Sequence, residues 1–251
     1  MNKYTVLAET IYKRRSVREY SSVPVGLLDT AADLTEVFNV QSLVPDIRVM
    51  IRVLKESEVK NGRSDYCIAF YSEEKPLYLE NIGFIGQQID LELQSRGLGT
   101  CWWGMKKPKK DYRSEDGLTC IITMTAGQPK NTETRSYPDG FKRKAAKDIL
   151  IGGGANIVAD GLIEAVRIAP SAVNLQPWLV EKEGNKYSFY IRPPKGLMEK
   201  MIGNMRRIDM GIALAHLFVA ARSAGQDVIF DFDGRDRPEG AFVAGVVVGE
   251  Q

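Results

Sequence analysis

The feature that most constrains the fold is a repeat, because two long apolar segments, one in each half of the chain, have related sequences. When Gly97 is aligned with Gly225, an offset of 128 positions, the segment Asn81-Ile82-Gly83-Phe84 falls on Asp209-Met210-Gly211-Ile212. Apolar residues recur at helical spacing in both segments, and a glycine can end each helix in the left-handed conformation. We therefore expect two equivalent long helices, each ending at its glycine.

The segments around these helices also follow one plan, which is helix, helix, hairpin, long helix and strand. In the first half we expect helices at residues 4–12, 24–39 and 76–96 and strands at 47–53, 66–71 and 118–126, with Asn61-Gly62 as the hairpin turn. In the second half we expect helices at 157–168 and 209–224 and strands at 178–181, 186–191, 228–232 and 241–248.

A polar, turn-rich segment at residues 130–140 is the predicted joint between the two copies. It separates a first half, residues 1–135, from a second half, residues 136–251, and we expect the halves to be intertwined around one core. Two copies packed about a pseudo-twofold axis would imitate a symmetric homodimer within one polypeptide.

Composition excludes several classes of partner. The chain has 251 residues, of which 44% are apolar, and its 34 basic and 32 acidic residues leave a net charge of +2. No overall field would recruit nucleic acid or anionic lipid, and the basic run Lys106–Lys110 is expected to be a solvated loop. Three cysteines without a Cys-x-x-Cys pair and a single histidine predict neither a disulfide framework nor a metal site. No apolar run is long enough to span a bilayer, so we expect a cytoplasmic protein.

A polar loop follows the helix predicted to end at residue 168. It reads Ala-Pro-Ser-Ala-Val-Asn-Leu-Gln-Pro-Trp from Ala169 to Trp178. Pro170 should end the helix, and Ser171, Asn174 and Gln176 then offer groups that both donate and accept hydrogen bonds. Such a loop suits a polar, uncharged, planar ligand. The alternative is a turn that only leads from the helix into the next strand.

A basic loop follows the first helix, at residues 13–20. Arg14, Ser16 and Arg18 alternate, so in an extended conformation they would project to one side and present two guanidinium groups and a hydroxyl to one anion, such as a phosphate. The alternative is an exposed basic end that favours the helix dipole.

Several conspicuous residues also have a plain structural interpretation. Trp102 and Trp103 could stack on a planar ligand, but adjacent tryptophans after a helix are more often packing residues. His216 lies in an apolar helix and is expected to be an internally hydrogen-bonded or interface residue, and Cys101 a small apolar filler. The run Gly152-Gly153-Gly154 lacks the Gly-Lys-Ser/Thr continuation of a nucleotide-binding P-loop.

Together these motifs resemble the nitroreductase family of flavin enzymes. The resemblance rests on the basic loop and on the polar loop at residues 169–178, called the Pro-Ser loop below, which precedes a hairpin. It also rests on the long helix ending Gly97-Leu98-Gly99-Thr100, with Trp103-Gly104 beyond it, and on Phe141-Lys142-Arg143-Lys144. In the family these motifs belong to one unit. Here the basic loop and the Trp103-Gly104 segment lie in the first half, whereas the Pro-Ser loop lies only in the second.

The resemblance implies an α+β fold with antiparallel or mixed sheets flanked by helices, here as an internally duplicated pseudo-dimer. In the family, FMN lies at the dimer interface and contacts both subunits, so in this chain it would lie between the halves. Residues 38–44 lack the Pro-Ser pattern and residues 142–147 lack the Arg-x-Ser-x-Arg order. The resemblance therefore implies one FMN per chain and is compatible with a monomer.

The resemblance also assigns roles to residues. Arg14 would bind the phosphate, Ser16 the ribityl chain or phosphate, and Arg18 the pyrimidine edge of the flavin. Pro170, Ser171 and Asn174 would contact the ring system, and Trp103 and Gly104 would place backbone groups near its N5 atom. Arg143, with Lys142, would add to phosphate binding or else belong to a solvated turn. The full predicted cofactor-binding set is Arg14, Arg15, Ser16, Arg18, Trp103, Gly104, Arg143, Pro170, Ser171, Ala172 and Asn174.

The activity implied is that of an NAD(P)H oxidoreductase, in which hydride passes to FMN and then, in a ping-pong cycle, to an electron-poor acceptor such as a nitroaromatic or a quinone. No side chain is assigned a catalytic role, because the flavin carries the electrons and solvent can supply protons. The alternative is a flavin-binding protein without turnover, for storage or sensing. A nucleic-acid module is disfavoured, since aromatics do not interleave with the basic runs.

Overall fold

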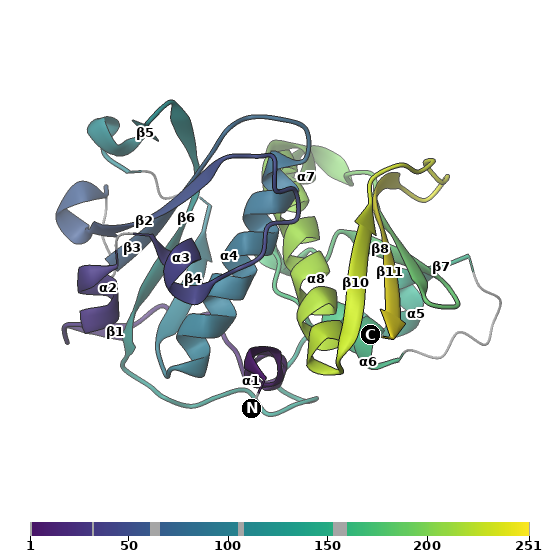
Figure 1. Ribbon diagram of the computed structural model, residues 1–251, viewed down its shortest axis with the longest axis horizontal. Coiled ribbons are helices and arrows are strands. Elements are labelled where there is room, and N and C mark those ends of the chain that lie inside the picture. The colour runs from purple at the N-terminus through teal and green to yellow at the C-terminus, as the bar shows by residue number, and fades with distance from the viewer. Residues whose placement is uncertain (1, 32, 61–65, 105–107, 153–159, 251) are drawn as a thin grey trace.

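Two long helices, α4 (Tyr78–Ser95) and α8 (Gly203–Ser223), lie side by side in the middle of the molecule, with one β-sheet beyond each of them (Figure 1). This arrangement is that of the computed structural model, which describes residues 2–31, 33–60, 66–104, 108–152 and 160–250. The predicted α+β fold with antiparallel and mixed sheets is confirmed.

The first sheet belongs to the first half of the chain. Its four main strands are antiparallel and follow the order β4 (Gly99–Trp103), β6 (Leu118–Pro129), β3 (Tyr66–Ser72) and β2 (Val49–Lys55). Two short strands, β1 (Tyr20–Ser21) and β5 (Ser114–Glu115), also pair with β6. Strand β3 is buried along its whole length, because apolar side chains pack against both faces of this sheet.

The second sheet repeats that strand order. It runs β10 (Gln226–Asp231), β11 (Ala241–Glu250), β9 (Lys186–Ile191) and β8 (Trp178–Glu183), again antiparallel, and the short strand β7 (Leu150–Ile151) joins β8 in parallel. In each half a hairpin precedes the long helix, and the next strand pairs with the last long strand of that half. The two sheets therefore share a strand order, and the internal duplication itself stays a prediction.

The two long helices touch at a pair of glycines that the offset of 128 positions relates to each other. A Cβ added to Gly83 would lie 2.0 Å from the carbonyl oxygen of Ile208, and one added to Gly211 would lie 1.9 Å from that of Glu80. The same offset relates Glu80 to Ile208, so each helix makes the same contact with the other, as in an isologous interface. Gly97 and Gly225, with φ of +80° and +76°, end the helices as predicted.

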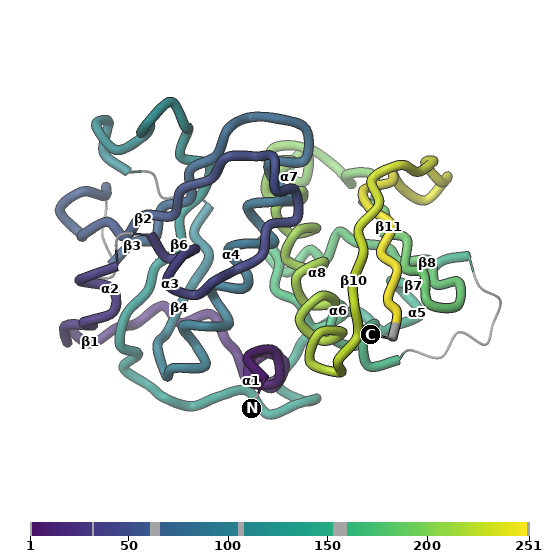
Figure 2. Tube along the Cα trace, viewed as in Figure 1, coloured from purple at the N-terminus to yellow at the C-terminus, as the bar shows by residue number. Residues whose placement is uncertain are grey.

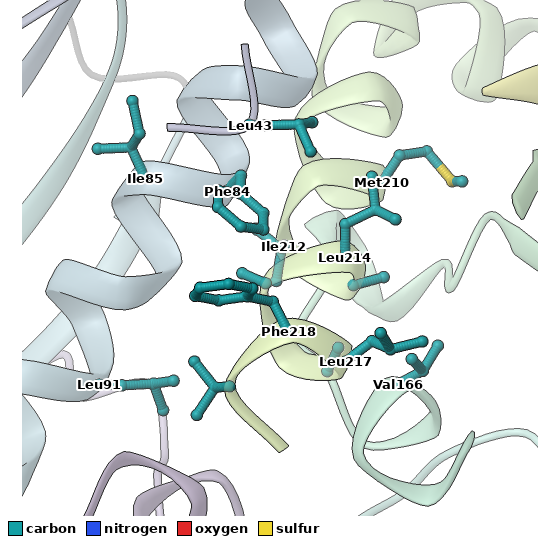
Figure 3. Close-up of a cluster of buried hydrophobic side chains, with 14 of the residues drawn as sticks. Leu43, Phe84, Ile85, Leu91, Val166, Met210, Ile212, Leu214, Leu217 and Phe218 are labelled. Carbon is teal, nitrogen blue, oxygen red and sulfur yellow. The ribbon is translucent and has the colours of Figure 1, made fainter. Parts of the chain in front are cut away.

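One hydrophobic core joins both halves. Its largest cluster contains residues of both sheets and of both long helices. Figure 3 shows Phe84 of α4 and Phe218 of α8 facing each other, and their ring centroids are 5.3 Å apart. Phe141, the residue directly after the predicted joint, belongs to the same cluster. Where one half ends and the other begins, at residue 135, stays a prediction.

Shorter helices complete the structure. Helix α1 (Lys3–Ile11) lies across one end of both long helices (Figure 2), and α6 (Gly161–Arg167) packs on α8. The remaining short elements are α2 (Gly26–Thr30), α3 (Leu34–Phe38), α5 (Ala146–Ile149), α7 (Gly196–Met201) and the 3-10 turns η1 (Glu56–Glu58), η2 (Lys110–Tyr112) and η3 (Ala172–Asn174).

Local side-chain capping explains two differences from the predicted helices. The helix expected at 24–39 is split into α2 and α3, because Ala31 is extended and Asp33 caps α3, with Oδ1 accepting from Thr35 N at 2.7 Å. The helix expected from residue 157 has its N-cap at Asp160, whose Oδ1 accepts from Ile163 N at 2.8 Å.

Other differences concern the ends of elements. Helix α8 begins six residues before the predicted start at 209, and α7 was not predicted. The predicted Asn61-Gly62 turn and residues 157–159 lie outside the described residues, as do two glycines of the run at 152–154 and part of the lysine-rich loop.

The glycine contact gives a direct test of the packing. We expect Gly211→Ala to lower the free energy of unfolding by about 1–3 kcal/mol, because the new methyl group must push the α4 backbone away. Gly203→Ala is the matched control on the same helix, since nothing lies within 4 Å of its added Cβ, and its effect should stay within about 1 kcal/mol. Urea denaturation of both variants measures the difference, and equal stabilities would contradict the proposed contact.

Candidate functional site

A cavity of about 480 Å³ lies where the two halves meet. It is bounded by the basic loop and β4 from the first half, and by the Pro-Ser loop and α8 from the second. Most of the predicted site residues line it, namely Ser16, Arg18, Trp103, Gly104, Pro170, Ser171 and Ala172. The remaining lining residues were not predicted as a set, and they are Cys101, Trp102, Ile122, Val173, Ile202, Met205, Ile208, Asp209 and Ile212. The structure thus brings together motifs that lie about 150 residues apart in the sequence.

The Pro-Ser loop has a tightly held backbone. Val173, Asn174 and Gln176 all have positive φ, of 45°, 58° and 51°. Such conformations are uncommon for residues other than glycine and need support from neighbouring groups. Ser171 Oγ accepts a hydrogen bond from Gln176 N at 2.9 Å, and Gln176 Oε1 accepts from Lys144 N at 2.7 Å. The loop therefore has a shape fixed by its own side chains and by the segment 141–144.

Asn174 departs from its predicted position. Its Oδ1 accepts from Arg143 Nη1 at 2.9 Å, and its Nδ2 donates to the carbonyl of Lys142 at 2.9 Å. The amide is therefore directed toward the 142–143 backbone and is not part of the cavity lining. Arg143 also donates from Nε to Ala169 O at 3.0 Å, so this arginine braces the start of the loop from outside the cavity.

The basic loop also differs from the predicted extended arrangement. Val17 N donates to Thr100 O at 2.8 Å, which places Ser16 and Arg18 against β4 and beside the cavity. Arg14, however, still continues the turn of α1, since its N donates to Thr10 O at 2.8 Å. Its side chain is only 1% exposed, and Nε lies 2.8 Å from Asp90 Oδ2. The expected common side for Arg14, Ser16 and Arg18 is thus wrong, because Asp90 attracts the first guanidinium inward.

Asp90 is the centre of a buried polar network. Its carboxylate accepts from Gln87 Nε2 at 2.8 Å, from Gln94 Nε2 at 2.7 Å and from the hydroxyl of Thr100. A buried carboxylate needs such donors as well as an opposite charge. Gln87 Oε1 in turn accepts from Trp102 Nε1 at 3.2 Å, which connects the network to the cavity wall.

A cluster of arginines lies next to this network. Burial, and then the positive charges of Arg14, Arg18 and Arg15, lower the pKa of Arg135. Burial, and then Arg135 and Arg14, lower the pKa of Arg143 to about 10. Among the described residues, Nη1 and Nη2 of Arg14 and Nη1 of Arg135 have no hydrogen-bond partner, although they are buried. Like charges gathered with free donors form a site suited to a multiply charged anion.

Arg135 was missed in the sequence because it lies in a polar segment without a motif. In the structure its Cζ lies 5.0 Å from the centre of the Phe141 ring, and Arg143 Cζ lies 5.9 Å from the same ring. Cation–π contacts of this kind hold guanidinium groups in place. The only sequence signal was the nearby Phe-Lys-Arg-Lys motif.

Three conspicuous residues have the structural roles that were expected. His216 Nδ1 lies 2.8 Å from Ala165 O, and burial lowers the pKa of the imidazole to about 3, so it is neutral. Burial raises the pKa of the Cys101 thiol, which keeps it protonated. The ring of Trp102 stacks on Phe70 with centroids 5.3 Å apart, although Trp102 and Cys101 both line the cavity.

The chain matches the family model described as "Putative TM nitroreductase" over residues 6–221, and it therefore belongs to that family. The resemblance inferred from the motifs is confirmed. No curated protein matches the chain.

Several solved structures are similar to this chain over all or part of its length. One is named as a putative nitroreductase from Thermotoga maritima, with 19% identity, a TM-score of 0.64, and coverage of 98% of this chain and 95% of that one. A nitroreductase family protein from Clostridium difficile has 17% identity and a TM-score of 0.45, covering 62% of this chain and 100% of that one. A nitroreductase with bound FMN from Desulfitobacterium hafniense has 16% identity and a TM-score of 0.40, covering 55% of this chain and 96% of that one.

Within the described part of the chain, no helix has the length and apolar character needed to cross a membrane. The predicted cytoplasmic location stays a prediction.

The buried ion pair between Arg14 and Asp90 gives a second test. We expect Asp90→Ala to lower the free energy of unfolding by about 3–5 kcal/mol, because it leaves the buried Arg14 guanidinium without its counter-charge. Glu9→Ala is the control, since its pair with Lys13 is solvent-exposed at 59% and 60% of the side chains and should contribute less than about 1 kcal/mol. Chemical denaturation compares the two, and a small effect for both would show that Asp90 does not stabilise Arg14.

Proposed function

We propose that this chain is an FMN-dependent oxidoreductase that takes hydride from NAD(P)H and reduces electron-poor acceptors such as nitroaromatics or quinones. Membership of the nitroreductase family supports the oxidoreductase class. The observation that carries the cofactor assignment is the cavity between the halves, with its apolar walls and the adjacent arginine cluster.

The donor set of the site fits FMN. The cavity walls include Trp103, Ile122 and Ile212, which suit a flat ring system, and Ser16 and Arg18 add polar groups to them. The unpartnered guanidinium nitrogens of Arg14 and Arg135 supply donors for a phosphate. A phosphate monoester also places negative charge among arginines whose own charges repel one another.

Different residues of the chain would enclose the cofactor and stabilise charge beside it. FMN, when bound, accepts and donates the hydride. Arg18 supplies a fixed positive charge at the cavity, which stabilises negative charge as it develops there. The rigid Pro-Ser loop supplies one wall of the cavity from the second half. Ile202, directly after α7, and Met205, near the start of α8, supply a second, apolar wall. These walls exclude water from the reacting groups.

We further propose one FMN per chain, because the second position of the pseudo-dimer is filled by side chains. The offset of 128 positions places Phe84 at the position of Ile212, Leu43 at that of Ser171 and Phe230 at that of Trp102. Phe84 and Leu43 are buried and lie near each other in Figure 3, and the Phe84 and Phe230 rings are 5.5 Å apart. Phe84 and Leu43 are thus larger or more apolar than Ile212 and Ser171, their counterparts at the proposed site.

The main test is direct. We expect purified protein mixed with FMN to retain flavin absorbance after desalting, to saturate at one FMN per chain in a fluorescence titration, and to oxidise NADH or NADPH when menadione is present. Protein that stays colourless would refute the proposal. Bound flavin without oxidation by any acceptor would instead favour a flavin-storage or flavin-sensing role.

The phosphate contact can be tested separately with two ligands. We expect Arg135→Ala to weaken FMN binding by about 10-fold or more, as for the loss of a charge-assisted hydrogen bond. Binding of riboflavin, which has no phosphate, should not change. Arg96→Ala is the matched control, because this arginine is 54% exposed and pairs with Glu92. Fluorescence titrations give the dissociation constants, and an equal loss for both ligands would place Arg135 away from the phosphate.

A further inference from the structure

Asp209 is the one acidic side chain among the described residues that line the cavity. It projects from α8, and the residue is 3% exposed. Ala172 N, in the Pro-Ser loop, donates to its carboxyl group, with distances of 3.0 Å to Oδ1 and 3.1 Å to Oδ2. The carboxyl group therefore connects the helix to the loop and also borders the space proposed for the reaction.

The other half of the chain shows what this connection requires. Asn81 stands at the equivalent position on α4, and its Oδ1 accepts from Leu43 N at 2.8 Å and from Val44 N at 3.1 Å. The offset of 128 positions relates Val44 to Ala172 as well. An amide thus performs the same task where no cavity is proposed. An acid stands only on the cavity side, and an acid, unlike an amide, can hold and release a proton.

Charged groups near Asp209 on α8 and α4 are engaged elsewhere. Arg206, on the same helix, directs Nη2 to the carbonyl of Arg192 and acts on Asp209 only through its more distant charge. Arg207 pairs with Glu80 of α4 at 2.7 Å. Among the described residues no ion pair to Asp209 is formed.

Two titratable groups from the first half line the same cavity. They are Arg18, from the basic loop, and Cys101, from β4, whose thiol is neutral. Burial is the largest influence on Asp209 and raises the pKa of its carboxyl to about 8, against the smaller lowering effects of the Ala172 N–H and of Arg206. At neutral pH the group therefore carries a proton.

We propose that Asp209 is the catalytic acid of the cavity, a neutral carboxyl group that donates its proton to the acceptor as that acceptor is reduced. This proposal rests on the proposed oxidoreductase function. Reduction of a quinone to a hydroquinone consumes one hydride, which NAD(P)H supplies, and one proton. The O–H bond of Asp209 breaks, the proton goes to an oxygen of the acceptor, and the carboxylate then regains a proton from water.

The protonation state can be tested without catalysis, on cofactor-free protein. Because the folded-state pKa is raised, the folded chain holds a proton that the unfolded chain has released, from about pH 4 up to the folded-state pKa of about 8. The melting temperature of the wild type should therefore fall as pH rises through this window. In Asp209→Asn, which copies the natural Asn81, this fall should be smaller. Identical pH dependence in both proteins would overturn the proposal.

The catalytic role can be tested with two acceptors. For menadione, we expect Asp209→Asn to lower kcat by about 100-fold or more and to abolish the decline of the wild-type kcat above about pH 8. For ferricyanide, which takes electrons without protons, the variant should lose far less activity than it loses with menadione. FMN affinity should be unchanged, which confirms that the site is folded. An unaltered menadione rate and pH profile would overturn the role of Asp209.

Asn81→Asp is the matched control, because it places a carboxyl group at the equivalent position outside the cavity. We expect its menadione kcat and pH profile to match those of the wild type. A loss like that of Asp209→Asn would mean that the exchange acts through packing, and would overturn the proposal. If the wild type oxidises no NAD(P)H with any acceptor, the proposed function is refuted. If the wild type is active and Asp209→Asn is equally active with menadione, only the proposed role of Asp209 as catalytic acid is refuted.

Discussion

The contact between α4 and α8 at Gly83 and Gly211 is the constraint on which the other features of the structure depend. Each glycine admits a backbone carbonyl of the other helix to a distance that no Cβ would tolerate. The helices can therefore pack closely enough for one core to form between the two sheets. Because α4 leads into β4 and α8 begins near the Pro-Ser loop, this contact also sets how far the two sides of the cavity stand from each other.

The shared strand order and the matched helix contact give two corresponding positions, and differences between side chains make them unequal. On one side Phe84 and Leu43 are buried in the core, and on the other Ile212 and Ser171 border a cavity. The connections differ as well, because residues 73–77 join β3 to α4 directly, whereas α7 lies between β9 and α8. One of the two positions is thus packed with side chains, whereas the other borders a cavity whose walls come from both halves.

The parts of the fold that were predictable are those encoded by local pattern. The period of apolar residues and the glycines placed α4, α8 and the hairpin β8–β9, and the family resemblance placed the Pro-Ser loop opposite the basic loop. Side-chain direction was not predictable, since it depends on partners distant in sequence. Arg14 turns inward because of Asp90, and Asn174 turns toward Arg143. Arg135 had no motif at all, and only the folded chain shows its unpartnered nitrogen beside other arginines.

The arginine cluster connects stability with function. Asp90 neutralises only part of the charge that Arg14, Arg135 and Arg143 bring into a partly buried region, and the lowered pKa values of Arg135 and Arg143 reflect this burial and mutual repulsion. Repulsion of this kind destabilises the folded state in the absence of an anion. A phosphate bound as proposed would remove it, and ligand binding to the folded chain alone raises the free energy of unfolding as the ligand concentration exceeds its dissociation constant. The same residues that weaken the empty protein would therefore select an anionic cofactor over a neutral one.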